Sequence, residues 1–238
     1  KSCVSLVSVA LPQTLTEIED GAFYNCRALE RVQLPNSLQT IGDGAFLCCD
    51  ALERVIVPSG TAAIGENAFG GCTNLKSVVI PKECSKISDG TFSGCNSLEN
   101  VVIPENVKSI GDCAFYLCDS LKEATLPENV ECIGKGAFSG CGDLGKLTIE
   151  NSNCSFNEDD ILKAVSNCSG GTSDCFRGTI IAPSGSKADE YAEKNGYRFN
   201  SLDESPVLRG DANGDGTVNV RDAAFIANRV SLQKEKEL

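Results

Sequence analysis

The sequence contains no histidine and no tryptophan, and each absence narrows the functions that the chain can perform. The absence of imidazole removes the commonest general base. It also excludes the Ser-His and Cys-His nucleophile pairs and every zinc site that uses histidine. Because no nucleophile with a base beside it is evident, we predict that the protein is not an enzyme. The lack of tryptophan and the presence of only four tyrosines leave few aromatic platforms for sugars, which disfavours a carbohydrate-binding module.

Positive charge is also scarce. The chain has 238 residues, with 21 Lys and Arg against 33 Asp and Glu, and its net charge is −12. Nucleic-acid binding needs clustered cations that neutralise phosphates, so we exclude that class. No apolar run approaches the roughly 18 to 20 residues that span a bilayer, so we expect no membrane insertion, and the first residues do not form a convincing signal peptide.

A period of 23 residues dominates the first part of the chain. Three apolar positions repeat without an insertion, namely Phe23, Phe46, Phe69, Phe92, Phe115 and Phe138, then Ile18, Ile41, Ile64, Ile87, Ile110 and Ile133, then Leu29, Leu52, Leu75, Leu98, Leu121 and Leu144. Six units are complete. The chain opens within a further unit, so we expect that more repeats or an atypical cap precede Lys1 in a longer protein.

Each unit predicts one short strand and one turn. In LERVQLP, the apolar Leu29, Val32 and Leu34 alternate with polar residues, and a proline without an N–H ends the strand. The segment IGDGAF is too short for a stable helix and predicts a tight turn or a single helical turn on the opposite side. No unit can bury its own apolar residues, so neighbouring units must stack into a solenoid with a parallel sheet.

The units SLQTIGDGAFLCCDALERVIVP and NVKSIGDCAFYLCDSLKEATLP resemble the BspA-like leucine-rich repeats, over about residues 3 to 150. The resemblance implies an α/β solenoid over residues 1–150 and a closing unit over residues 151–200. In the closing unit, GTIIAPSGSKADEYAEKNGYRF predicts a strand at 178–182, a helix near 186–195 and a last short strand. Ser186 is the expected N-cap of this helix, and Gly196 is expected to end it.

Fourteen cysteines are present, and six of them follow the repeat: Cys26, Cys49, Cys72, Cys95, Cys118 and Cys141. We interpret these six, together with Cys84, as small buried thiols, because a free cysteine packs as a compact hydrophobe. Metal ligation is the poorer interpretation, since the chain has no C-x-x-C pair and no histidine. Cys168 and Cys175 flank SGGTSD and could close a small loop, which the sequence alone does not establish.

The stretch DANGDGTVNVRD, residues 211–222, has oxygen-bearing side chains at the positions of a calcium-binding loop. Calcium takes six to eight oxygen ligands, and Gly216 stands where such a loop turns sharply. We therefore predict a bound calcium ion, with Asn219 close to it or linked through water and with these ligands: Asp211, Asn213, Asp215, the carbonyl of Thr217, and Asp222. The alternative is a simple surface turn rich in Asp, Asn and Gly.

The residues around this loop depart from an EF-hand. Pro206 and Gly210 discourage an entering helix, AAFIANRVSLQKEKE predicts an exiting one, and position 12 is Asp222. The stretch GDANGDGTVNVRDAAFIANRV resembles one half of a type I-like dockerin, the calcium-dependent module that binds cohesins on cellulosome scaffolds. The resemblance implies a linker at 201–209, a partial dockerin at 210–238 with its second half beyond Leu238, and cohesin contacts at Val220, Arg221, Ala227 and Asn228.

One outward row of the predicted sheet contains three successive apolar residues. The row reads Gln33, Ile56, Val79, Val102, Thr125 and Thr148, and Arg31, Arg54, Glu53 and Glu99 flank it. A docked partner and the strand preference of β-branched residues explain the row equally well. We predict a non-catalytic, secreted protein-protein interaction module that a dockerin attaches to an extracellular, cellulosome-type complex, with an unknown protein or glycan on the sheet. The alternative is a carbohydrate or host/cell-surface adhesion module.

Overall fold

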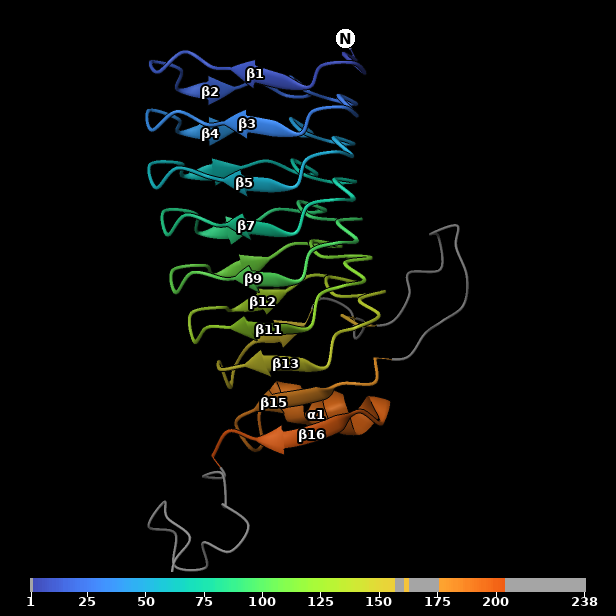
Figure 1. Ribbon diagram of the computed structural model, residues 1–238. Helices are drawn as coiled ribbons and strands as arrows, with labels where there is room; N and C mark the ends of the chain where they lie inside the picture. The colour runs from blue at the N-terminus through green and yellow to red at the C-terminus, as the bar shows by residue number, and fades with distance from the viewer. Residues whose placement is uncertain (1, 157–160, 163–175, 204–238) are drawn as a thin grey trace, which may run out of the picture. The chain divides into compact units, whose positions relative to one another are not determined.

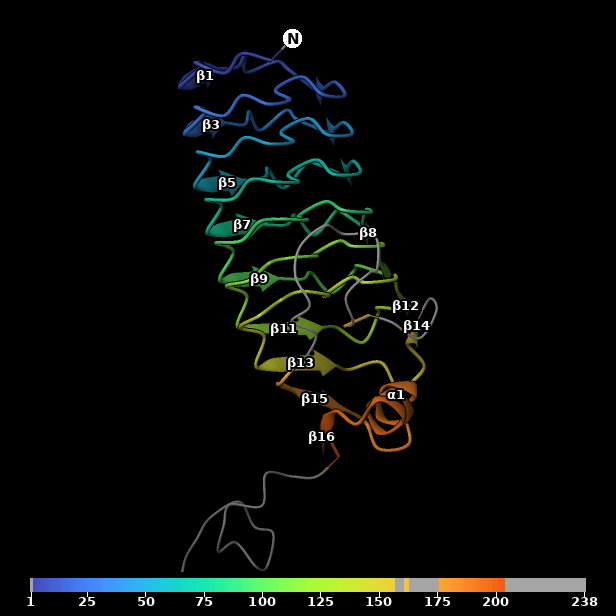
Figure 2. The same cartoon turned by 90° about the vertical axis from the view of Figure 1, so that its right-hand side faces the viewer.

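The computed structural model describes residues 2–156, 161–162 and 176–203. The chain divides after Asn200 into two units, and residues 1–200 form the first. Short parallel strands run along two opposite sides of this unit, one turn of chain stacked on the next (Figure 1). Figure 2 shows the two sets of strands from the side, with connecting turns between them. The unit is a parallel β-solenoid.

The first side carries the strands that the alternation predicted. They are β1 (Ser8–Ala10), β3 (Arg31–Gln33), β5 (Arg54–Ile56), β7 (Ser77–Val79), β9 (Asn100–Val102), β11 (Glu123–Leu126), β13 (Lys146–Ile149), β15 (Thr179–Ala182) and β16 (Arg198–Ser201). Strands β5 to β16 form one seven-stranded sheet, and β1 pairs with β3, which lies next to β5. We call this side the large sheet. Up to β13 its paired strands are in register at intervals of 23 residues, as in Val55, Val78 and Val101, whereas β15 pairs with β13 at an interval of 33 residues.

The second side is a further set of parallel strands, which the sequence did not predict. They are β2 (Glu17–Ile18), β4 (Thr40–Ile41), β6 (Ala63–Ile64), β8 (Lys86–Ile87), β10 (Ser109–Ile110), β12 (Cys132–Ile133) and β14 (Ser155–Phe156). Each is two residues long and ends at the repeated isoleucine or its equivalent. The IGDGAF segments that follow are tight turns, as expected, and within the described residues they contain no helix. The α/β prediction was therefore wrong for the repeats.

The closing unit agrees with its prediction. Helix α1 (Lys187–Asn195) begins at Ser186, whose side chain accepts a hydrogen bond from the backbone N–H of Asp189. It ends at Gly196, whose φ of 70° suits a residue without a side chain. Strands β15 and β16 flank the helix in sequence and pair with each other. The helix is the only one in the described part of the chain.

A stack of phenylalanines fills the core between the two sides. Six rings from Phe23 to Phe138 lie nearly parallel, with centroids 5.1 to 5.8 Å apart. The repeated cysteines lie beside them and are buried, as predicted. The thiols of five repeated cysteines each donate to the carbonyl of a phenylalanine 26 residues earlier, for example Cys72 Sγ to Phe46 O at 3.2 Å. The five are Cys49, Cys72, Cys95, Cys118 and Cys141. Cys168 and Cys175 lie outside the described residues.

Candidate functional site

The large sheet exposes a row of three apolar side chains. Ile56, Val79 and Val102 are 74%, 56% and 75% exposed, whereas the residue before each of them is buried. This follows from the strand period of two, because Val55, Val78 and Val101 already occupy the core face. Ile56 pairs in register with Val79, and Val79 with Val102, so the three side chains are contiguous. We call them the apolar row.

Polar residues continue the row in both directions. Gln33 on β3 and Thr125 on β11 are exposed, as predicted. Thr148 on β13 was also predicted to face outward, and the register places it beside the exposed Thr125, but it is only 6% exposed. It lies in register between Thr125 and Ile181, and β13 is buried along three consecutive residues. The row of exposed side chains therefore ends at Thr125.

The first residue of each strand forms a second exposed row, which carries charge. Arg31 and Arg54 begin β3 and β5, Ser77 and Asn100 begin the central strands, and Glu123 begins β11. Within the described residues, neither arginine forms an ion pair. The charge of this row therefore changes from positive at β3 and β5 to negative at β11, and it returns to positive at Lys146, the exposed first residue of β13.

Two hollows of similar size lie on this face, at opposite ends of the apolar row. The first has a volume of about 380 Å³ and is lined by Arg31, Gln33, Arg54 and Ile56, among others. The second has a volume of about 410 Å³, and its lining includes Val102, Thr125 and three glutamates, Glu105, Glu123 and Glu150. We call them the basic and the acidic hollow. Each combines an end of the apolar row with charge of one sign.

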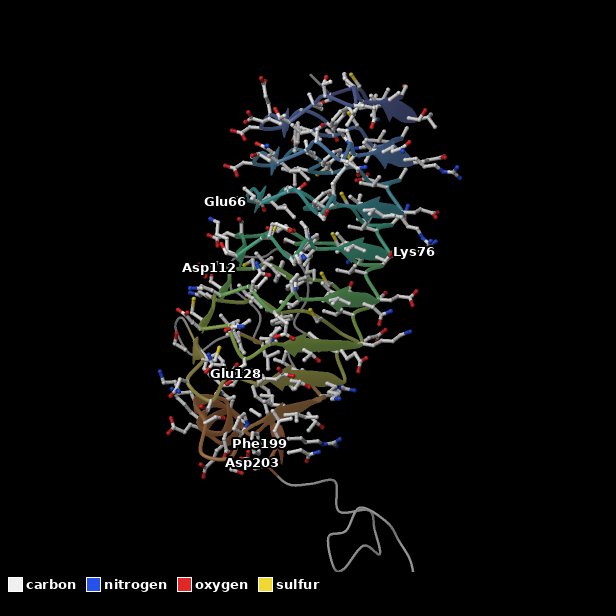
Figure 3. The ribbon with its side chains drawn as sticks, turned by 90° about the vertical axis from the view of Figure 1, so that its left-hand side faces the viewer. Glu66, Lys76, Asp112, Glu128, Phe199 and Asp203 are labelled. Carbon is white, nitrogen blue, oxygen red and sulfur yellow. The ribbon has the colours of Figure 1, made fainter. Side chains whose placement is uncertain are left out.

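The edge of the face is electrostatically paired. Lys76 lies 3.5 Å from Glu53, and Lys122 lies 3.5 Å from Glu99, each pair linking successive turns. Figure 3 shows Lys76 beside the large sheet, whereas Glu66 and Asp112 project from the opposite side of the solenoid. Exposed pairs of this kind contribute about 1 kcal/mol or less, so Glu53 and Glu99 define a polar rim more than they stabilise the fold.

Sequence reasoning found the apolar row and the two arginines but missed the acidic hollow. Its glutamates come from three different repeats, and two of them lie in the turns that follow the strands. Two signals were available: Glu105 follows the repeated proline, where earlier units have the neutral Asn36 and Ser59, and Glu150 replaces the proline itself.

The described part of the chain has no candidate metal centre, and its buried repeat cysteines are not activated. No group of three His, Cys, Asp or Glu residues is placed there to hold a metal ion. Burial raises the pKa of the Cys95 thiol to about 12, and that of Cys141 likewise to about 12. Because the thiolate is the nucleophile, these buried thiols are unreactive at neutral pH. In the same described residues, no helix has the length and apolar character needed to cross a membrane.

The predicted calcium and cohesin sites lie outside the described residues. This applies to every residue proposed for them: Asp211, Asn213, Asp215, Thr217, Asp222, Val220, Arg221, Ala227 and Asn228. They remain predictions from the sequence, as does the division at 201–209 and 210–238.

Comparisons with known proteins agree with the solenoid. Residues 1–97 and 85–170 match a family model described as the BspA type leucine-rich repeat region, with six copies. The crystal structure of a leucine-rich repeat protein of T. pallidum is 29% identical and has a TM-score of 0.60, with 82% of this chain and 85% of that chain covered. A search of curated proteins gives no match.

Two further crystal structures share the fold. A leucine-rich repeat protein of Bacteroides ovatus ATCC 8483 is 24% identical with a TM-score of 0.52, covering 76% of this chain and 56% of that one. A leucine-rich repeat protein of Eubacterium ventriosum ATCC 27560 is 22% identical with a TM-score of 0.55, covering 71% of this chain and 47% of that one.

Proposed function

The chain belongs to the BspA-type leucine-rich repeat family, and we propose that it is a secreted, non-catalytic interaction protein that binds another protein through its large sheet. We further propose that residues 210–238 attach it to an extracellular, cellulosome-type complex by calcium-dependent binding to a cohesin. The apolar row is the observation that carries the first proposal, and the calcium-type loop supports the second.

The apolar row supports protein binding because its exposure has no structural purpose. Three contiguous aliphatic side chains in water contribute nothing to the core, and roughly 25 cal/mol is gained for each Å² of apolar surface that a partner covers. A polar and charged rim surrounds the row, as at protein-protein interfaces. Strand preference alone explains β-branched residues here, but it does not explain the charged hollows at the two ends.

The loop at 211–222 supports calcium binding through the chemistry of its donors. Asp211, Asp215 and Asp222 supply carboxylates, and Asn213 and the carbonyl of Thr217 supply neutral oxygens, all of which are hard ligands that suit calcium. When bound, the ion would order the loop and so present Val220 and Arg221, with Ala227 and Asn228 of the following segment, to a cohesin.

Cohesin binding is tested with the full chain against a panel of cohesins, in calcium and then in chelator. We expect binding in calcium that chelator abolishes, and we expect Asp215→Ala with Asp222→Ala to abolish it as well. Asp143→Ala, an exposed carboxylate of the repeat array, is the matched control. Binding that is absent, or that survives chelation, contradicts the proposed attachment and leaves the solenoid's own surface as the functional element.

The role of the sheet is tested with the double variant Ile56→Asp and Val102→Asp. Extracellular proteins retained by the wild-type chain are identified, purified and titrated against both forms. Because both side chains are exposed, the variant should fold normally and lose binding. Tyr24→Asp, at an exposed aromatic residue of a turn, serves as the control. Equal binding by all three forms, or retention of glycans alone, contradicts the proposal.

A further inference from the structure

The exposed patch of the large sheet is self-complementary about β7, the middle strand of the apolar row. The apolar row is centred on Val79, with Ile56 on one side and Val102 on the other. Beyond these residues, the basic hollow lies over β3 and β5, and the acidic hollow lies over β9 and β11. Both hollows are therefore placed symmetrically about β7, with opposite charge.

We propose that the partner of this face is a second copy of the same chain, docked sheet to sheet with its stack of repeats reversed. This inference rests on the proposed function of the large sheet and names its partner. A two-fold axis that runs parallel to β7, midway between the two sheets, places β5 opposite β9 and β3 opposite β11 of the second copy. The strands of the two copies then run parallel. An interface of this kind uses the same patch on both copies, so complementarity within one face is what it requires.

The contacts follow from the register. Val79 meets Val79 of the second copy, and Ile56 meets Val102, so that the two apolar rows cover each other. In the row formed by the first residue of each strand, Arg31 meets Glu123 of the second copy. Arg54 lies against the neutral Asn100 of the second copy, which is next to that glutamate. Each contact occurs twice, once on each side of the axis. Sheets that pack face to face lie about 10 Å apart, a separation that aliphatic side chains of this length fill.

The alternative face-to-face arrangement is disfavoured by charge. A two-fold axis along the solenoid reverses the strands and places β3 and β5 of the two copies against each other, so that each basic hollow faces the basic hollow of the other copy. The same arrangement brings the acidic hollows together, with the three glutamates of each. Like charges held opposite one another across an interface are destabilising, so only the reversed stack pairs opposite charges.

The expected association is weak. From β3 to β11 there are four strand spacings, which gives a patch about 19 Å long. With only three apolar side chains along it, this patch is small beside a standard interface, which buries roughly 800 Å² on each partner. Both copies also carry a net charge of −12, which opposes their approach. We therefore expect a reversible dimer that forms as the protein concentration is raised.

Charge exchange between two variants tests the proposal, with sedimentation equilibrium of the full chain as the measurement. One variant carries Arg31→Glu and Arg54→Glu, and the other carries Glu123→Arg. Each variant alone places like charges across the interface and should associate at least about tenfold more weakly than wild type. Their equimolar mixture should recover association, because position 31 of each copy then meets the opposite charge at position 123 of the other. Lys86→Glu, an exposed residue of β8 in the second set of strands, changes the charge elsewhere and should behave as wild type.

A wild-type chain that stays monomeric, or a mixture no better associated than its components, overturns the proposal. Loss of protein binding by the Ile56→Asp and Val102→Asp variant, with wild type monomeric, overturns the dimer alone and leaves the proposed function standing. Retained protein binding by that double variant contradicts the proposed function itself. The two failures are therefore distinguishable.

Discussion

The carboxylate of Asp89 accepts a hydrogen bond of 2.9 Å from the backbone N–H of Asp112 in the next turn of the solenoid. The same contact joins Asp20 to Asp43, Asp43 to Glu66, and Asp112 to Lys135. The residue before each N–H donor is a glycine, and the aspartate carboxylate lies where the side chain of that residue would otherwise be. The four glycines are Gly42, Gly65, Gly111 and Gly134. One turn has Glu66 in place of the aspartate, and in the turn after it Ser88 stands in place of the glycine.

Gly111→Ala should therefore destabilise the protein. A Cβ atom at this position would lie 2.6 Å from the backbone nitrogen of Asp89, which cannot move without opening the turn. We expect a loss of about 1 to 3 kcal/mol in the free energy of unfolding, measured by urea denaturation. Gly142→Ala is the control, because the nearest atom to its Cβ would be 3.9 Å away. Equal stability of the two variants would show that the contact does not constrain the turn.

Phe92→Ala should cost more, because it removes a ring from the middle of the aromatic stack. Phe92 is fully buried between Phe69 and Phe115, with centroids 5.8 and 5.5 Å away. Truncation of a buried phenylalanine costs about 3 to 5 kcal/mol. Phe23→Ala, at the half-buried end of the stack, should cost less in the same denaturation experiment. A cost that does not depend on position in the stack would contradict this account.

Stability should fall as the pH rises above 9. Burial raises the pKa of Cys95 and of Cys141 from 9.0 to about 12, and it raises the pKa of Cys118 as well. Between these values the unfolded chain releases thiol protons that the folded chain retains, so the free energy of unfolding decreases with pH. Each such thiol contributes a slope of about 1.4 kcal/mol per pH unit.

Denaturation at pH 8 and pH 10, under reducing conditions, measures this slope. Cys95→Ala removes one contributing thiol and should reduce the slope, although the variant is less stable at pH 8. If the free energy of unfolding falls by the same amount from pH 8 to pH 10 in Cys95→Ala and in wild type, this thiol does not resist ionisation in the folded protein.

Most of the fold was predictable because it depends on residues at fixed spacing. Alternation of apolar and polar residues predicts the strands of the large sheet, and the 23-residue period predicts the buried cysteines. Ser186 and Gly196 predict the two ends of α1. The second set of strands has no such signal, because two residues cannot alternate. It exists through hydrogen bonds between turns, as from the N–H of Gly42 to the carbonyl of Ile18.

The candidate site was predictable only in part for the same reason. The apolar row repeats with the period, so Ile56, Val79 and Val102 were identified from sequence. The acidic hollow combines a strand residue, Glu123, with two turn residues that the period does not align. The burial of Thr148 was not predictable either, because its neighbour in the next strand, Ile181, lies beyond the end of the 23-residue period.

Removal of one predicted calcium ligand should weaken calcium binding sharply. Asp215→Ala takes one of three carboxylates from a loop whose affinity depends on the number of charged ligands. Titration calorimetry should show calcium binding by the wild-type chain and loss of affinity by at least about tenfold in the variant. Asp143→Ala should bind as wild type, and a wild-type chain that binds no calcium would contradict the predicted site.

The most direct test of the large sheet as an interaction surface is photo-crosslinking from defined positions. A photoreactive amino acid is placed at Ile56, at Val102 or, as the control, at Lys86 in the second set of strands. Each chain is irradiated with the extracellular proteins of the organism that makes it. We predict covalent adducts, with a second copy or another protein, from positions 56 and 102 and not from position 86. Adducts from position 86 in equal amount, or none from the large sheet, would contradict the central claim.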